Sequence, residues 1–252
     1  MPFVIKFGIL LQYIFMETTI QNQSSESQVP SYEDMVKSGM HFGRKKSVFN
    51  PKMKPFIHVA RDNIYIIDLV KTREGLGSAM DFLKKSLEEG KLVLFVGLSA
   101  QSADLTKDLA ESLNMPYVIN RWLGGTLTNF KTIISRVNYL ESMEKEMALG
   151  EFEKYTKKER LMKEKEIVKL RERFDGLRKL TRVPDVIFVA SVRDSDLVLK
   201  EAKKSKVKTV GIVNTESDPT VLNFAIPAND NARRSIELII NSLKSYLKSA
   251  SS

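Results

Sequence analysis

The sequence predicts an α/β protein whose doubly wound parallel sheet is interrupted by an inserted antiparallel coiled-coil helical hairpin. Apolar strand runs alternate with helical segments through most of the chain, an order that produces parallel strands joined by right-handed crossovers. Two of the runs, LVLFVG and VIFVA, are apolar throughout, as in strands that are buried on both faces. Residues 129–180, by contrast, carry no strand signal and only helical periodicity.

The first third of the chain is expected to form a short helix, a β-hairpin and a long helix. Ser31 before YEDMVK and Gly39 after it are typical of a helix N-cap and a C-terminal stop. FIHVA and IYIIDL are β-branched runs separated by residues 61–63, which predicts two strands joined by a tight turn. Thr72 then opens a helix that Gly90 ends, directly before the LVLFVG strand.

The later elements follow the same alternation. We expect a helix to about Leu113 and a short YVI strand, and then, beyond residue 180, the VIFVA strand near residue 188. A helix around residues 197–203, the strands TVGIV and FAI, and a final helix to about Leu247 complete the pattern. Only residues 129–180 depart from this alternation of strands and helices.

That block, residues 129–180, predicts two helices lying against each other. Gly150 is a stop signal, and Thr156 with Glu159 forms a capping box for the second helix. Each helix carries a narrow seam of apolar residues at three- and four-residue steps: Phe130, Ile133, Val137, Leu140, Met143 and Met147, then Ile167, Leu170, Phe174 and Leu177. Such seams pack against each other, so the block is expected to protrude as a coiled-coil hairpin of about 30 Å or more.

The composition divides the chain into five stretches: an N-terminal extension (1–30), the first part of the α/β domain (31–128), the hairpin (129–180), the second part (181–248) and a tail (249–252). The extension opens with an apolar run that is shorter than the roughly 20 residues needed to cross a bilayer, and no small-residue cleavage site follows it. We interpret residues 1–15 as translated upstream sequence before a start at Met16, with a signal or membrane anchor as the alternative. The Ser/Gln-rich remainder is expected to be disordered.

Charge and composition narrow the classes of function. The chain has 40 Lys and Arg against 31 Asp and Glu, a formal net charge of +9, which favours a polyanionic partner. Nucleic acid is the first candidate and an anionic membrane surface the second. There is no Cys, which excludes disulfides, thiolate catalysis and Cys-based zinc sites. With only two His, a multi-His metal site is excluded as well, and no metal is expected.

The stretch NRWLGGTLTNF raises the question of a nucleotide site. A glycine pair before a helix is a common phosphate cradle, because free N–H groups and the helix dipole converge there. The other candidate, LVLFVGLSAQSADL, has a strand, one Gly and a helix, but it lacks the further glycines of a dinucleotide site, and no Walker Lys-Ser/Thr pair occurs. A buried strand-to-helix turn is the favoured interpretation of that second stretch.

The remaining titratable residues favour structural roles. His58 lies in an apolar strand run, as a hydrogen-bonded structural His does, whereas His41 either orients a backbone turn or touches RNA. Five carboxylates fall near strand ends, where catalytic groups and helix caps both occur: Asp68, Asp185, Asp194, Asp218 and Asp230. Capping is the expected role for most of them.

The basic residues are better organised than the acidic ones. One segment holds Arg44, Lys45, Lys46, Lys52, Lys54, Arg61, Lys71 and Arg73, interleaved with Phe42, Phe49 and Phe56. One interpretation is that these residues simply form a solvent-exposed loop. Because Gly and Pro stiffen this loop, we favour a preordered surface that contacts phosphates and positions a nucleic acid without reading its bases.

Several motifs resemble, in order and spacing, the bacterial small-subunit ribosomal protein S-2 family. They are GMHFGRKKSVFNPKMKPFI, IYIIDLVKT, NRWLGGTLTNFKTI, GEFEKYTKKERLM, PDVIFV, SDP and FAIPAND. RWLGGTLTN and NPKMKP are the most specific of these. The resemblance runs from about Tyr32 to the final helix.

The resemblance implies a flavodoxin-like or Rossmann-like domain with a protruding hairpin, located in the cytoplasm within the small ribosomal subunit. It implies binding to 16S rRNA, contact with neighbouring small-subunit proteins and recruitment of ribosomal protein S-1. It implies no catalytic activity, cofactor, small-molecule substrate or membrane partner. The chain departs from the family pattern at Arg44, at residues 97–100, and at Asn214 and Ala228. An α/β enzyme acting on a nucleotide or phosphorylated sugar is the alternative function.

Within this framework NRWLGGTLTNF joins the α/β core to the hairpin. Gly124 and Gly125 let the chain turn, Thr126 or Thr128 caps the first hairpin helix, and Trp122 wedges the junction. Arg121 is the candidate phosphate contact. The other residues expected to shape these motifs are His41, Gly43, Asn50, Pro51 and Asn129.

Overall fold

The computed structural model describes residues 29–248 of the chain. The expected upstream segment (1–15) and the tail (249–252) lie outside the described residues, and the proposed domain bounds stay predictions. None of the described helices is both long and apolar enough to cross a membrane.

The main sheet has five parallel strands: β4 (Val93–Val96), β5 (Tyr117–Val118), β6 (Val186–Val189), β7 (Lys208–Val213) and β8 (Phe224–Pro227). Their order is β5-β4-β6-β7-β8, with Val93 opposite Val186 and Val210 opposite Phe224. The chain therefore winds first to one side of β4 and then to the other, which confirms the doubly wound α/β fold.

Side chains of the central strands alternate between two apolar layers. Phe95 and Phe188 pack with α3 (Leu69–Glu88), α4 (Ala103–Ser112) and α8 (Arg233–Lys248). Leu94 and Ile187 pack on the opposite face, with α7 (Asp196–Lys204), Trp122 and the hairpin root. Both faces are thus covered, which is why these strands are apolar throughout. Helix α3 starts at Leu69 rather than Thr72, because the Asp68 side chain accepts a hydrogen bond from Val70 N and caps it.

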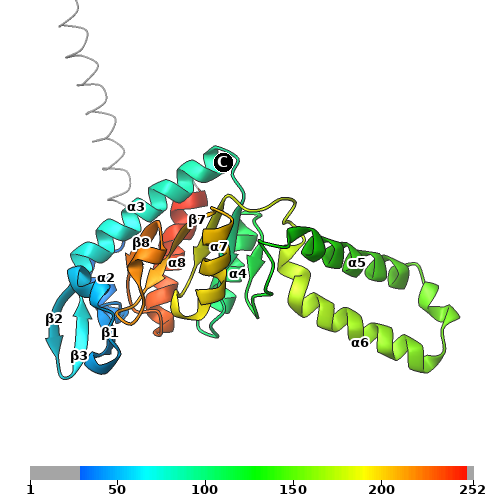
Figure 1. Ribbon diagram of the computed structural model, residues 1–252, viewed down its shortest axis with the longest axis horizontal. Coiled ribbons are helices and arrows are strands. Elements are labelled where there is room, and N and C mark those ends of the chain that lie inside the picture. Colours follow the sequence, from blue (N-terminus) through cyan, green and yellow to red (C-terminus); the bar gives the residue numbers. More distant parts are fainter. Residues whose placement is uncertain (1–28, 249–252) are drawn as a thin grey trace, which may run out of the picture.

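A second, antiparallel sheet precedes the main one. Strands β1 (Phe42–Lys45), β2 (Ile57–Arg61) and β3 (Ile64–Ile67) pair in the order β1-β3-β2, next to α2 (Tyr32–Lys37) at one end of the molecule (Figure 1). The β2–β3 hairpin was predicted, and its turn residues Asp62 and Asn63 both have positive φ. Describing the basic segment as a loop was wrong. It contains β1 and two 3-10 helices, η1 (Lys46–Val48) and η2 (Pro51–Phe56).

The inserted block forms two helices, α5 (Phe130–Ala148) and α6 (Lys157–Phe174), which project from the α/β body (Figure 1). Gly150 has φ +74° at the end of α5, and the predicted capping box of Thr156 and Glu159 is present at the start of α6. Among the seam residues, Ile133, Val137, Leu140, Met143, Ile167 and Phe174 are buried. The coiled-coil geometry of this pair stays a prediction. Three further short helices are η3 (Glu151–Lys154), η4 (Asp175–Leu177) and η5 (Arg193–Ser195), and η6 (Pro219–Val221) links β7 to β8.

Candidate nucleic-acid interface

Arg44 docks the small sheet onto the main one. Its Nε lies 2.9 Å from Oε1 of Glu216, and its Nη2 lies 2.8 Å from the same oxygen. Nη2 also donates to Asn231 Oδ1 at 2.7 Å and lies 3.8 Å from the buried Asp230 carboxylate. The guanidinium therefore binds side chains of its own chain. Its planar set of N–H donors allows it to contact several of them at once.

Asp230 extends this network across the carboxyl ends of three strands. It accepts hydrogen bonds from Ser191 Oγ after β6 and from Asn214 Nδ2 after β7, both at 2.8 Å. Asn214 in turn accepts from the N–H of Thr215, so this departure from the family pattern still forms a turn. The carboxyl edge of such a sheet is where α/β enzymes bind ligands. Here a buried polar network and Arg44 occupy it.

Gly43 and Asn50 complete the docking. A Cβ at Gly43 would lie 2.6 Å from Thr215 Cγ2 and 2.8 Å from the Tyr65 carbonyl oxygen, so only glycine fits. Asn50 donates its N–H to the Thr215 carbonyl at 2.9 Å, and its side chain accepts from Lys52 N to cap η2, where Pro51 is the first residue. These motif residues hold the basic segment in one conformation against the main sheet.

Three of the predicted basic residues extend from this rigid support into solvent. Lys45 ends β1, Lys46 begins η1, and Lys54 lies in η2 beside the fully buried Met53. All three are exposed, and none has a carboxylate within ion-pair distance in the part of the chain that the structure describes. An exposed cation on a fixed backbone is well suited to contact phosphate.

The other basic residues of the set have partners in the protein. Lys52 Nζ lies 2.5 Å from Asp218 Oδ2, and Lys71 Nζ lies 3.0 Å from Glu74 Oε2. The Arg73 guanidinium stacks over the Tyr32 ring, with Cζ 5.2 Å from its centroid. Arg61, at the tip of the β2–β3 hairpin, lies 3.5 Å from Asp62 with its side chain 82 % exposed. Exposed pairs of this kind are weak, so a phosphate can replace the carboxylate.

The loop NRWLGGTLTNF does cradle an anion, and the anion is the carboxylate of Glu201. This α7 side chain, 6 % exposed, accepts hydrogen bonds from Gly125 N at 2.7 Å, Leu127 N at 3.1 Å and Trp122 Nε1 at 3.2 Å. Burial alone would raise the pKa of Glu201, but these donors outweigh it and hold the pKa below its usual value. The loop is therefore filled from within and holds the hairpin root against α7.

One detail of this loop differs from expectation, and one agrees with it. Neither Thr126 nor Thr128 caps α5, so that prediction was wrong. Thr126 Oγ1 donates to the Leu123 carbonyl at 2.6 Å, and the N-cap of α5 is Asn129, which makes no side-chain capping bond. Trp122 is buried at the junction, as a wedge should be.

Replacing Gly125 with Ala should lower the free energy of unfolding by about 1–2 kcal/mol, whereas replacing Gly124 with Ala should change it little. Gly125 has φ +95°, a conformation that side chains rarely adopt, while a Cβ on Gly124 would meet only Leu197 at 3.9 Å. Urea unfolding of the two variants measures the difference. Equal losses at both positions would contradict the role given to Gly125.

Arg121 lies at the hairpin root with cations that sequence reasoning did not select. It is exposed and lines a hollow of about 220 Å³ together with Lys107, Arg171 and Arg173. Arg121 is far in sequence from Arg171 and Arg173, so no local pattern links them. The grouping follows from the way the hairpin returns to the sheet next to β5.

His41 is poorly suited to attract phosphate by charge. Burial lowers its pKa below the ordinary value, which favours the neutral ring at pH 7. The ring lies 4.1 Å from that of Phe42, and its backbone carbonyl accepts a hydrogen bond from Ile67 N. His58 lies in strand β2, as predicted, with its side chain exposed.

The second nucleotide candidate uses its glycine for packing. A Cβ on Gly97, directly after β4, would lie 2.3 Å from Thr106 Oγ1 of α4. The missing side chain thus allows the helix to approach the strand. Among residues 29–248, no three His, Asp or Glu side chains gather closely enough to hold a metal ion.

Comparison with known proteins decides between a nucleic-acid-binding protein and an enzyme. The family model "Ribosomal protein S2" matches residues 35–250. The chain belongs to the ribosomal protein S2 family. Small ribosomal subunit protein uS2 of Mycoplasmopsis synoviae is 41 % identical over 231 residues, covering 90 % of this chain and 78 % of that protein. Its counterpart in Roseiflexus castenholzii is 44 % identical over 209 residues, covering 83 % and 80 %.

Family membership confirms several expectations. An S2 protein is a structural, non-enzymatic component of the small ribosomal subunit in the cytoplasm, and it associates with the rRNA and proteins of that subunit. The enzyme alternative was therefore wrong. The occupied carboxyl edge of the sheet and the filled glycine loop agree with this conclusion, because both places where an α/β enzyme binds a nucleotide hold groups of the protein itself.

Proposed function

We propose that this S2 protein binds 16S rRNA through phosphate contacts made by the basic residues of the small sheet, and so supports translation as part of the small subunit. The observation that carries the proposal is the set of exposed, unpaired lysines on a docked backbone, namely Lys45, Lys46 and Lys54. Lys52, Arg61, Lys71, Arg73 and Arg121 supply further contacts at the periphery. Arg44 contributes by holding the small sheet in place.

The backbone that carries these lysines is already held in one conformation, so it loses little conformational entropy when RNA binds. Met53 is fully buried, Asn50 caps η2, and Gly43 packs against the turn after β7. Phosphate contacts from such a surface fix register and orientation, with affinity that depends strongly on salt.

Two finer features complete the proposal. The apolar seams of α5 and α6 pack as a coiled coil, which the burial of Leu140 and Ile167 supports.

From the family resemblance we further infer that the protein helps to recruit ribosomal protein S-1. Capture of that protein by small subunits that contain or lack this chain tests the second point.

The triple variant Lys45→Gln, Lys46→Gln and Lys54→Gln should bind 16S rRNA more weakly, and the slope of log K against log salt should become shallower by about 2–3. Filter binding between 50 and 200 mM salt measures both quantities. The control replaces Lys37, Lys85 and Lys244 of α2, α3 and α8, which changes the net charge equally. If both triple variants keep the wild-type slope, the small sheet does not contact phosphate.

A further inference from the structure

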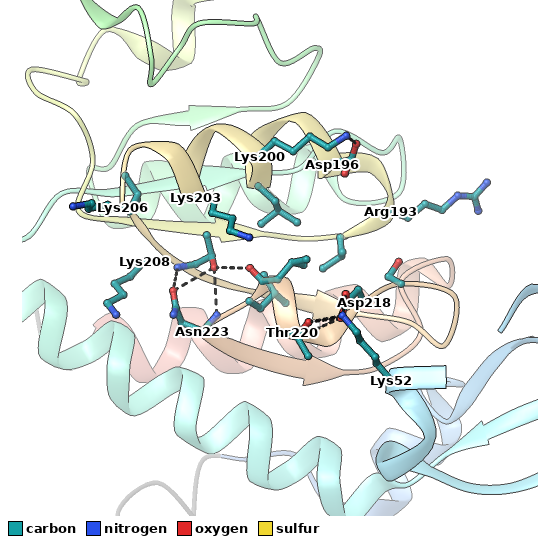
Figure 2. Close-up of a pocket in the computed structure, with 17 residues that line it drawn as sticks. Lys52, Arg193, Asp196, Lys200, Lys203, Lys206, Lys208, Asp218, Thr220 and Asn223 are labelled. Atoms are coloured by element: carbon teal, nitrogen blue, oxygen red, sulfur yellow. Dashed lines mark hydrogen bonds and ion pairs between the residues drawn. The ribbon is translucent and has the colours of Figure 1, made fainter. Parts of the chain in front are cut away.

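A cavity of about 770 Å³ lies between α7 and the segment that connects β7 to β8 (Figure 2). Parallel neighbours are usually connected by a crossover helix that covers the sheet. Here the connection contains only the three-residue η6, so the groove beside α7 stays open. Leu199, Val207 and Leu222 are buried side chains among its lining residues. The cavity follows from the topology and is of a size that ligand sites commonly have.

The lining of this cavity is strongly basic. Six of its residues are cationic, namely Lys52, Arg193, Lys200, Lys203, Lys206 and Lys208, against two carboxylates. Both carboxylates are already paired: Asp218 with Lys52 and Asp196 with Lys200, each at 2.5 Å. Arg193 approaches Glu216 at 3.4 Å, so the excess positive charge that no described carboxylate pairs is carried by the three remaining lysines.

That excess is concentrated at one end of the cavity. Lys203, Lys206 and Lys208 are all exposed, and no carboxylate of the described chain lies within ion-pair distance of them. Figure 2 places them where α7 ends and β7 begins. Three like charges at one end of the cavity repel one another, so an anion bound there would be stabilised.

Lys206 occupies a backbone position where glycine is the usual residue. It follows the C-cap of α7 with φ +56°, and the helix ends with a hydrogen bond from Val207 N to the Ala202 carbonyl. A lysine pays a conformational penalty there that glycine would avoid. The helix dipole favours a cation near this helix end, and an anion beside Lys206 would add to the offset of the conformational penalty.

We propose that this cavity, through Lys203, Lys206 and Lys208, is a second binding site for the RNA sugar-phosphate backbone, additional to the basic surface of the small sheet. The inference rests on the proposed rRNA binding and extends it to α7. Among the described residues no aromatic side chain lines the cavity, so it offers no stacking platform for bases. Recognition there is directed at phosphates and is independent of base sequence.

Lys52 connects the two basic surfaces. It belongs to η2, next to the exposed Lys54, and it also lines the cavity, where its Nζ bonds Asp218 and Thr220. A single polyanion can therefore run from the small sheet past Lys52 to the lysines at the end of α7. This continuity favours RNA over an acidic protein segment, which would need only one of the two surfaces.

The test uses the variant Lys203→Gln, Lys206→Gly and Lys208→Gln in the full chain. Glycine is chosen at position 206 because it adopts φ +56° without strain. Filter binding to 16S rRNA should give a salt slope shallower than that of wild type by about 2, whereas the Lys37, Lys85 and Lys244 control should change it less. Circular dichroism and thermal unfolding confirm that the variant is folded.

Each outcome separates this inference from the proposed function. If wild type and the Lys45, Lys46 and Lys54 variant behave as proposed but the cavity variant equals the control, the cavity does not bind RNA and only this inference fails. If the cavity variant keeps the wild-type slope but enters small subunits poorly, the cavity takes an acidic protein segment, which also overturns the inference. If wild type itself ignores rRNA, both proposals fail.

A second measurement does not depend on affinity. Because the chain has no Cys, Lys206→Cys creates a unique attachment point for an iron chelate that cleaves nearby RNA. In assembled subunits this probe should cut 16S rRNA at a defined place, and the same probe at Lys85 should not cut there. Absence of cleavage from position 206 would contradict an RNA backbone in the cavity.

Discussion

Replacing Glu201 with Gln should lower the free energy of unfolding by about 2–4 kcal/mol at pH 7. The ionised carboxylate accepts hydrogen bonds from Gly125 N, Leu127 N and Trp122 Nε1 inside the fold. An amide keeps one acceptor oxygen and turns its NH₂ group towards a donor, which leaves buried groups unsatisfied. Urea unfolding measures the loss, and hydrogen exchange should show the 122–128 amides opening more often.

The effect of Glu201 should depend on pH in a defined direction. Its pKa in the folded protein lies below the ordinary 4.5, so the carboxylate stabilises the fold fully above about pH 4.5. That stabilisation is lost as the pH falls through the folded-state pKa. The difference between wild type and the Gln variant is therefore largest at neutral pH and shrinks in acid.

Glu237→Gln is the matched control, because Glu237 is an exposed residue of α8 with no ion pair to a described residue. This variant should change the free energy of unfolding by less than about 0.5 kcal/mol. If Glu201→Gln behaves like Glu237→Gln, the glycine loop is not held by the carboxylate.

Replacing Arg44 with Ala should cost about 2–4 kcal/mol of stability, because it leaves Asp230 without its cation and Glu216 with only the exposed Arg193 at the carboxyl edge of the sheet. Their side chains are only 12 % and 2 % exposed, so water compensates little. Urea unfolding gives the cost, and the amides of β1 and β3 should lose protection first.

Arg193→Ala provides the comparison. Arg193 also approaches Glu216, at 3.4 Å, but its side chain is 55 % exposed, so its loss should cost less than about 1 kcal/mol. Equal effects of the two substitutions would contradict the docking role of Arg44. If Arg44→Ala kept its stability but lost affinity for rRNA, Arg44 would be a phosphate contact instead.

The parts of the fold that local sequence encodes were predictable. LVLFVG and VIFVA became β4 and β6 because continuous apolar character is what a doubly covered strand requires. Ser31 and the Thr156–Glu159 pair acted as caps because capping involves residues only a few positions apart. Strand β1 was missed because HFGRKK has little apolar character, and its pairing with β3 depends on residues some 20 positions away.

The parts that long-range contacts decide were not predictable. The anion-binding geometry of NRWLGGTLTNF was recognised, but its partner Glu201 lies in α7, 76 residues beyond Gly125. Likewise Arg44 lay within a basic run, and only the fold brings it to Glu216, 172 residues away. Similarly, basic residues are common at helix C-termini, so the cavity lysines at the end of α7 did not indicate a binding site.

Reconstitution of small subunits most directly tests the claim that the basic residues of the small sheet bind this protein to rRNA. Subunits that lack the S2 protein are mixed with wild type, with the Lys45, Lys46 and Lys54 variant, or with the Lys37, Lys85 and Lys244 control, and are then sedimented. Wild type and control should co-sediment with the subunits at moderate salt, and the first variant should remain largely in the supernatant. Equal co-sedimentation of all three proteins would contradict the account.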